Sequence, residues 1–204
     1  MAGTWLREEQ EDLASQRILD GASAAFVELG VSRTGMGDIA RYAGCSRGTL
    51  YRYFKNRHEL HLAYVNRSAL ELAARVEVGL EGVSDPRLRL VEGIVRSVRE
   101  VRETPGTAAW FAPGETAIGA RMSRFSEVIE ALAGGFVARL LGTDEDEANR
   151  LSARWLVRVI VSLLTVPEKS EAEERELIER FVAPALLAHA REKHRPPNRA
   201  SRPR

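Results

Sequence analysis

The sequence has few of the features that mark secreted or membrane-embedded proteins. It contains one cysteine among 204 residues, Cys45, so it cannot form an intrachain disulfide. Its longest apolar stretch, residues 156–166, is interrupted by Arg158, and acidic residues rather than an apolar run follow the first few positions. We therefore expect no signal peptide, no membrane span and a cytoplasmic location. Cys45 fits a half-buried small side chain better than a redox sensor.

The sequence also lacks the short motifs of common enzymes. It has no glycine loop followed by Lys-Ser or Lys-Thr for phosphate binding, and no Gly-x-Ser-x-Gly turn for a nucleophile. His58-Glu59-Leu60-His61 resembles a zinc-binding helix, but its histidines are three residues apart, whereas the metalloprotease motif needs them four apart. We predict no enzymatic activity, no metal site and no cofactor.

The alternation typical of β-strands is missing throughout, whereas helix boundaries are frequent. With 44% hydrophobic and 29% charged residues, the chain is able to bury a core. Capping residues predict helix starts at Asn56, Asp85, Thr143 and Ser170. A further long helix is predicted from Glu115 to Leu141. The pattern predicts an all-α fold of about nine helices.

The most informative feature present is a helix-turn-helix pattern in residues 34–54. Residues 38–43 place small apolar side chains on one stripe at helical spacing, as in a short packing helix. Gly44 can adopt the left-handed backbone that ends such a helix, and Ser46 can cap the next one. The second helix of such a motif enters the major groove of DNA with its N-terminal residues near base edges.

The second helix also carries an unusual charge pattern. Leu50 and Phe54, four residues apart, predict its buried side and leave Arg47, Thr49, Arg52 and Tyr53 facing outward. Residues 31–57 hold six basic side chains and one acid, a net charge of +5, whereas the whole chain has a net charge of +1. An arginine-rich face can simply be solvated. The adjoining turn favours an anionic partner instead.

Residues 13–62 resemble the DNA-binding segment of the TetR family of transcriptional regulators. The resemblance is carried by the helix at residues 16–30 and by residues 39–40, 43–44, 46–51 and 53–60. It implies an N-terminal three-helix DNA-binding domain and a C-terminal helical domain for ligand binding and dimerisation. We accordingly expect an arm, a DNA-binding domain, a ligand-binding and dimerisation domain and a disordered basic tail, at residues 1–12, 13–60, 61–192 and 193–204.

The resemblance also implies roles for individual side chains. Thr34 is expected to cap the first motif helix near a phosphate, and most of the other matching positions are expected to approach the sugar-phosphate backbone. Arg47 and Arg52 are our candidate base readers, because an arginine can bridge the two acceptors of a guanine edge. The predicted DNA-binding residues are Thr34, Arg47, Gly48, Thr49, Tyr51, Arg52, Tyr53, Lys55 and Arg57.

Family members are homodimers joined by their last two long helices, which here are expected near residues 144–165 and 171–191. Apolar stripes on these two segments are suitable for such an interface, although each stripe can equally serve the subunit's own core. The predicted interface residues are Leu151, Val159, Leu177 and Phe181. A dimer with two recognition helices about one DNA turn apart predicts a pseudopalindromic operator in double-stranded DNA.

Bulky side chains from several segments predict an apolar ligand pocket, although each of them can instead be ordinary core. We expect Arg158 to point inward and to pair with Glu127 or Glu130, or with an acidic ligand. The predicted pocket residues are Trp110, Phe111, Met122, Phe125, Trp155 and Arg158. The resulting hypothesis is a dimeric repressor that leaves its operator when a small apolar effector binds. The alternative is a helical lipid or drug carrier, which has no use for Arg47 and Arg52.

Overall fold

The computed structural model describes residues 4–143 and 147–193, and these residues form helices and no strand. The predicted all-α fold is therefore confirmed. The helices are α1 (Thr4–Leu29), α2 (Met36–Tyr42), α3 (Arg47–Tyr53), α4 (Arg57–Gly79), α5 (Pro86–Glu103), α6 (Pro105–Ala108), α7 (Thr116–Phe125), α8 (Glu127–Leu141), α9 (Glu147–Thr165), α10 (Glu171–Leu177) and α11 (Ala183–Lys193). A short turn, η1 (Ala109–Phe111), precedes α7, and one wide turn, η2 (Ile178–Val182), joins α10 to α11.

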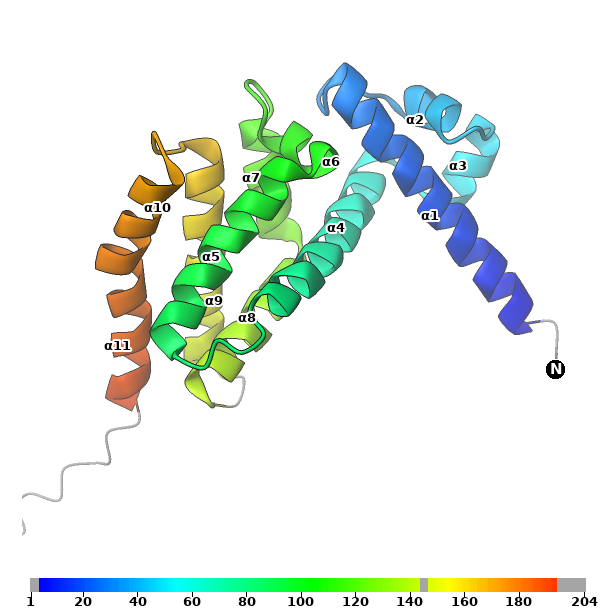
Figure 1. The fold of residues 1–204 in the computed structure, drawn as a ribbon. Helices are drawn as coiled ribbons and strands as arrows, with labels where there is room; N and C mark the ends of the chain where they lie inside the picture. The colour runs from blue at the N-terminus through cyan, green and yellow to red at the C-terminus, as the bar shows by residue number, and fades with distance from the viewer. Residues whose placement is uncertain (1–3, 144–146, 194–204) are drawn as a thin grey trace, which may run out of the picture.

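The helices gather into two groups linked by α4. Figure 1 shows α1–α3 at one end of the molecule, α5 and α7–α11 at the other, and α4 running between them. We call the first group, with the start of α4, the head, and the second group the body. The head has its own core around Phe26, Val31, Ile39 and Leu50, all fully buried. The body is built around α5, whose apolar face packs against α8, α9 and the α10–α11 helix.

The predicted domain division stays a prediction, and the helix bounds bear on it in three places. Helix α1 begins at Thr4, so residues 4–12 of the expected arm are helical. Helix α4 runs across the boundary expected at residue 60. The expected tail, apart from Lys193, lies outside the described residues. Within residues 4–143 and 147–193, no helix has both the length and the apolar character that a membrane crossing requires.

Three of the four predicted helix starts are confirmed by their capping bonds. The side chains of Asn56, Asp85 and Ser170 accept hydrogen bonds from the backbone N–H three residues later, at 2.9, 2.7 and 3.3 Å. The fourth start was predicted from Thr143 with Asp146, and Asp146 lies outside the described residues. The described part of that helix, α9, begins at Glu147.

The single long helix predicted from Glu115 to Leu141 is wrong. The helix is interrupted at Ser126, whose extended backbone separates α7 from α8. Oγ of Ser126 accepts from the N–H of Ile129 (3.0 Å) and donates to Oδ1 of Asn66 on α4 (2.7 Å). Ser126 therefore acts as a new N-cap, and a side chain 60 residues away in the sequence holds it in place.

The crossing of α1 and α2 depends on the small size of Gly21. A Cβ at this position would lie 2.5 Å from the amide nitrogen of Ala43 and 2.7 Å from its Cα. We expect Gly21→Ala to lower the free energy of unfolding by about 1–3 kcal/mol, because backbone atoms must move. Gly134→Ala in α8 is the matched control, since a Cβ there meets nothing within 4 Å. The control should gain up to about 1 kcal/mol, and denaturant unfolding of both variants measures the difference. Equal stabilities would contradict the close crossing.

Candidate DNA-binding surface and ligand cavity

The turn between α2 and α3 has the geometry that the sequence predicts. Gly44 adopts a left-handed backbone with φ of +65°. Oγ of Ser46 accepts a hydrogen bond from the N–H of Thr49 (3.0 Å) and so caps α3. Leu50 and Phe54 are buried in the core of the head. These contacts fix which face of α3 points outward.

The outward face of α3 carries the predicted arginines and an aromatic ring. Arg47, Gly48, Tyr51 and Arg52 are exposed. The guanidinium of Arg52 lies 5.1 Å from the ring centre of Tyr53 and donates to the Tyr53 hydroxyl (3.2 Å). Lys55, just beyond the helix, is exposed, whereas Thr49 and Tyr53 are half-buried. One short helix thus presents two guanidinium groups and a phenol to solvent.

Gly37 on α2 has a role that sequence reasoning missed. A methyl group at this position would overlap the guanidinium of Arg47, which lies against the backbone of α2. The glycine therefore leaves room for Arg47 at the start of α3. The unusual Gly35-Met36-Gly37 sequence was a signal for this, since a glycine inside a helix often marks a close approach.

Thr34 does not cap the first motif helix, so that prediction is wrong. Its side chain is fully buried, and Oγ1 lies 2.7 Å from the carbonyl of Gly30 and 3.2 Å from that of Ala25. The N-cap of α2 is Gly35, whose N–H donates to Oδ2 of Asp38 (3.0 Å). Thr34 ties the end of α1 to the turn and does not face solvent.

Arg57 is likewise engaged inside the protein. Its guanidinium donates to the carbonyls of Val31 and Ser32, the latter at 2.8 Å. These bonds fix the turn between α1 and α2 against the start of α4. These bonds occupy part of the Arg57 guanidinium, and the phosphate contact predicted for it stays a prediction, whereas Lys55 is exposed.

A buried glutamate joins this turn to the body. Glu115, between η1 and α7, is 7% exposed. Its carboxylate accepts from the N–H of Ser32 (2.9 Å to Oε2) and from the Ser32 hydroxyl (2.6 Å to Oε1). The two residues are 83 positions apart, so no local pattern could have revealed the contact. We call it the Glu115–Ser32 link.

Aromatic rings fill the space beside this link. Trp110 of η1 packs edge-on against Phe26 of α1 and stacks on Tyr64 of α4, with ring centres 5.3 and 5.9 Å apart. The ring of His61 lies 5.0 Å from that of Trp110. The head therefore packs on η1 and α7 through an aromatic contact and the Glu115–Ser32 link.

His61 makes the stability of this contact dependent on pH. Burial, together with the nearby charge of Arg57, lowers the pKa of His61 from 6.5 to about 4. The unfolded chain therefore takes up a proton at a higher pH than the folded chain, and stability falls as the pH falls from 6.5 to 4. In His61→Phe we expect the free energy of unfolding to fall less between pH 6.5 and pH 4, by up to about 3 kcal/mol, than in the unaltered protein. Unfolding curves of the variant and of the unaltered protein at pH 7 and pH 4.5 measure it. An unchanged pH dependence in His61→Phe would contradict the assignment.

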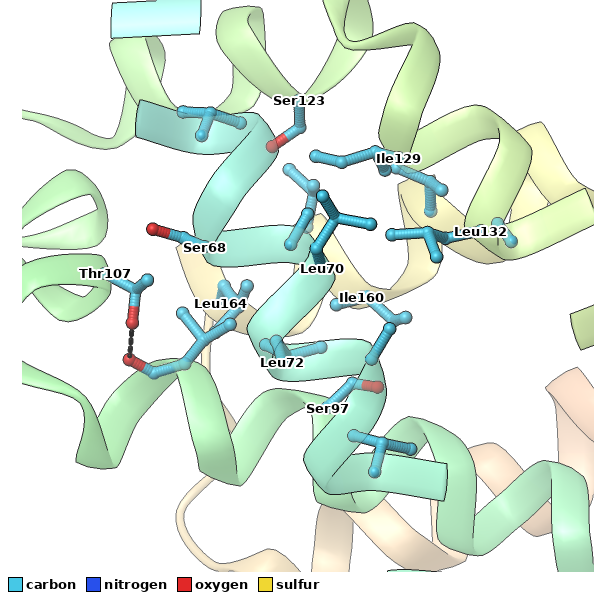
Figure 2. A pocket seen from close by; sticks show the side chains of 18 of the residues that line it. Ser68, Leu70, Leu72, Ser97, Thr107, Ser123, Ile129, Leu132, Ile160 and Leu164 are labelled. Atoms are coloured by element: carbon cyan, nitrogen blue, oxygen red, sulfur yellow. Dashed lines mark hydrogen bonds between the residues drawn. The ribbon is translucent and has the colours of Figure 1, made fainter. Parts of the chain in front are cut away.

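The body contains a cavity of about 400 Å³ between α4, α5, α8 and α9, close to the size of small-molecule sites. Its wall is almost entirely apolar (Figure 2). Three hydroxyls in the wall already donate to nearby backbone carbonyls. They belong to Ser97, Thr107 and Ser123, which bond to Gly93, Val101 and Gly119 at 2.7–2.9 Å.

The structure separates the predicted pocket residues. Trp110 and Phe111 line the cavity. Met122 is buried in the core of the head, Phe125 is exposed beside the ring of His58, and Trp155 packs against the core of the body. These three side chains are not part of the cavity wall.

The prediction that Arg158 points inward is wrong. Its side chain is exposed, because α9 turns Leu156, Ile160 and Leu164 toward the cavity and Arg158 lies off that stripe. Glu127 and Glu130 are therefore not partners of a buried arginine. The apolar flanks of Arg158 in the sequence suggested burial, but helical periodicity decides it.

The predicted interface residues fall into two classes. Leu151 of α9 and Phe181 of η2 are exposed, the latter at 70%. Val159 and Leu177 are partly buried and pack against the core of the body. For a metal site the described residues offer no group of three or more His, Cys, Asp or Glu side chains.

Comparisons with known proteins agree with this architecture. Residues 18–64 match the family "Bacterial regulatory proteins, tetR family". The chain is 43% identical over 187 residues to the uncharacterized HTH-type transcriptional regulator Rv1255c of Mycobacterium tuberculosis, covering 91% of this chain and 92% of the relative.

Two solved structures share the fold. The TetR family repressor AlkX from Dietzia sp., implicated in biodegradation of n-alkanes, has a TM-score of 0.66 at 21% identity, covering 86% of this chain and 96% of AlkX. RolR in complex with resorcinol has a TM-score of 0.64 at 18% identity, covering 91% and 94%. With the full-length relative, these findings show that the chain belongs to the TetR family and is a transcriptional regulator with an N-terminal helix-turn-helix DNA-binding domain.

Proposed function

We propose that the protein is a dimeric repressor whose α3 reads a specific operator and whose cavity binds a small apolar effector that releases it. The observation that carries the reading role is the outward face of α3. Arg47 and Arg52 lie on a short, capped helix, and Leu50 fixes its buried side. Arginines in this position can recognise guanine edges in the major groove.

The remaining exposed or half-buried groups around α3 are suited to phosphates. Gly48, Thr49 and Tyr51 lie along the helix, Tyr53 is its last residue, and Lys55 follows it. Hydroxyl, amide and ammonium donors hold a protein in register on DNA without reading its sequence. Arg52 must leave the ring of Tyr53 to reach a base.

Dimerisation is supported by exposed apolar side chains on the outer surface of the body. Phe181 and Leu151 are large apolar residues that face solvent in the single chain, on the two helical segments that form the interface in this family. A second copy of the chain would bury them. Two α3 helices about 34 Å apart would then meet successive major grooves on one side of the duplex.

We expect Phe181→Glu to convert the dimer into a monomer at micromolar concentration, because a buried unpaired carboxylate opposes association. Analytical ultracentrifugation measures the mass directly. Val78→Glu is the matched control, since Val78 on α4 is similarly exposed and lies outside the proposed interface. A Phe181→Glu variant that stays dimeric would place the interface elsewhere.

Release by an effector requires that the effector bind one conformation better than the other. Helix α4 is the natural lever, because it starts in the head and lines the cavity from Tyr64 to Glu77. Trp110 and Phe111 of η1 line the same cavity and lead directly to the Glu115–Ser32 link. Resorcinol bound to RolR shows that this fold accommodates a small molecule.

Selection of bound sequences from a random DNA pool with the purified protein tests the reading role. We expect one enriched pseudopalindrome with two half-sites about 10 base pairs apart, or a multiple of that spacing. A pool that shows no enrichment would favour the alternative, a carrier that uses the cavity without DNA.

A further inference from the structure

We propose that the cavity takes a long-chain amphiphile with an anionic head group, and that Arg139 holds this head group. The inference rests on the proposed effector role of the cavity and names the chemical class of the effector. Three observations carry it, namely the length of the cavity, its almost entirely apolar wall and the charge balance where it meets solvent.

The cavity is long in comparison with its volume. It follows α4 from Tyr64 to Glu77, a span of about 20 Å at 1.5 Å per residue. A cavity of about 400 Å³ that extends over this length can hold an extended alkyl chain. The hydroxyls of Ser97, Thr107 and Ser123 already bond to backbone carbonyls, so these groups offer a polar ligand few hydrogen bonds. Nε1 of Trp110, at the Tyr64 end of the wall, is a buried donor without a hydrogen-bond partner among the described residues, but it carries no charge.

The wall also includes an apolar side chain that is exposed to solvent. Leu70 lines the cavity and is 53% exposed. Figure 2 shows its side chain on α4 facing Ile129 and Leu132 of α8. An exposed leucine on this seam gives an alkyl chain a path between the two helices without crossing charged groups.

The charged residues of the wall lie at the far end of α4 from Trp110. Glu77 and Arg139 both line the cavity, and their side chains are 35% and 60% exposed. Oε1 of Glu77 is 2.6 Å from Nη2 of Arg139, and Oε2 is 2.5 Å from Nη2 of Arg89. One carboxylate therefore serves two guanidinium groups, which leaves a local charge of +1.

The excess of one positive charge at this end of the cavity favours a negatively charged head group. Arg89 is further held by the carbonyl of Leu80 (2.9 Å), whereas Arg139 has donors left over beyond its single bond to Glu77. An anion can share Arg139 with Glu77 or replace it. A cationic head group would compete with two arginines for Glu77, and a neutral end would gain nothing from Arg139.

Calorimetric titration of the full chain with dodecanoate, dodecan-1-ol and dodecylamine tests the proposal. We expect dodecanoate to bind about tenfold more tightly than the alcohol, with the amine the weakest. Equal affinity for acid and alcohol, a preference for the amine, or no binding of any of the three would overturn the proposal.

Variants locate the head group. Arg139→Ala should remove the preference for the acid, and Arg139→Lys should keep most of it. Arg75→Ala is the matched control, because Arg75 also pairs with a glutamate, Glu100 (2.6 Å), but does not line the cavity. Glu77→Gln should tighten dodecanoate binding, because it removes the competitor for Arg139, and a merely destabilised protein would not bind more tightly. Weaker binding by Glu77→Gln would overturn the proposal.

These titrations contain no DNA, so comparing them with operator binding measured in the presence of the same ligands separates this inference from the repressor mechanism. An Arg139-dependent preference for the acid that leaves operator affinity unchanged supports the inference and contradicts ligand-driven release. Release of the operator by the acid and the alcohol with equal potency, unaffected by Arg139→Ala, supports release and overturns the inference.

Discussion

Arg47→Ala is expected to weaken operator binding by about 30-fold or more. A guanidinium that bridges a guanine edge contributes about 1–3 kcal/mol of discrimination, and a symmetric dimer loses one such contact in each half-site. The variant should also relax the sequence preference at one base pair per half-site. Fluorescence anisotropy with the selected operator and its single-base variants measures both effects.

Arg75→Ala controls for the loss of one positive charge, because Arg75 pairs with Glu100 in the body, away from α3. It should change operator affinity little. If Arg47→Ala weakens all sequences equally, Arg47 contacts phosphate rather than a base. If operator affinity stays unchanged, α3 does not bind DNA in the proposed way.

Glu115→Gln is expected to reduce strongly the effect that a ligand in the cavity has on DNA binding by the head. The neutral side chain keeps the shape of the carboxylate but weakens charge-assisted bonds from Ser32, so the free energy of unfolding should fall by about 1–3 kcal/mol. Ligand effects on a distant site are commonly 5- to 150-fold. We expect the ratio of operator affinities without and with dodecanoate to fall close to one in this variant.

A double-mutant cycle with Ser32→Ala distinguishes the link from a general loss of stability. If Glu115 acts through Ser32, the double variant should be little worse than either single variant. Fully additive losses, or a normal ligand response in Glu115→Gln, would show that the two domains communicate by another route, such as the Trp110 contact.

Sequence reasoning succeeded where the determining interactions are local. The caps at Asn56 and Ser170 and the turn at Gly44 depend on residues within four positions, and the structure shows each of them. Short-range hydrogen bonds and backbone preferences suffice to place these boundaries. The outward face of α3 follows in the same way from the spacing of Leu50 and Phe54.

The errors arose where distant segments decide the outcome. Ser126 breaks the predicted helix because Asn66 holds it. Glu115 meets Ser32 across 83 positions. For Arg158 the local information is sufficient, since helical periodicity on α9 places it off the stripe of Leu156, Ile160 and Leu164, even though its neighbours in the sequence are apolar.

Sequence-specific DNA recognition by α3 is tested most simply by comparing two duplexes of equal length, the selected operator and a scrambled sequence. The affinity of the purified protein for each is measured between 50 and 200 mM salt. We predict that both affinities fall steeply, with a log–log slope of about −0.9 per phosphate contacted. The operator should bind at least about 1,000-fold more tightly than the scrambled duplex throughout. Equal affinities for the two duplexes, or binding insensitive to salt, would contradict sequence-specific DNA recognition by α3.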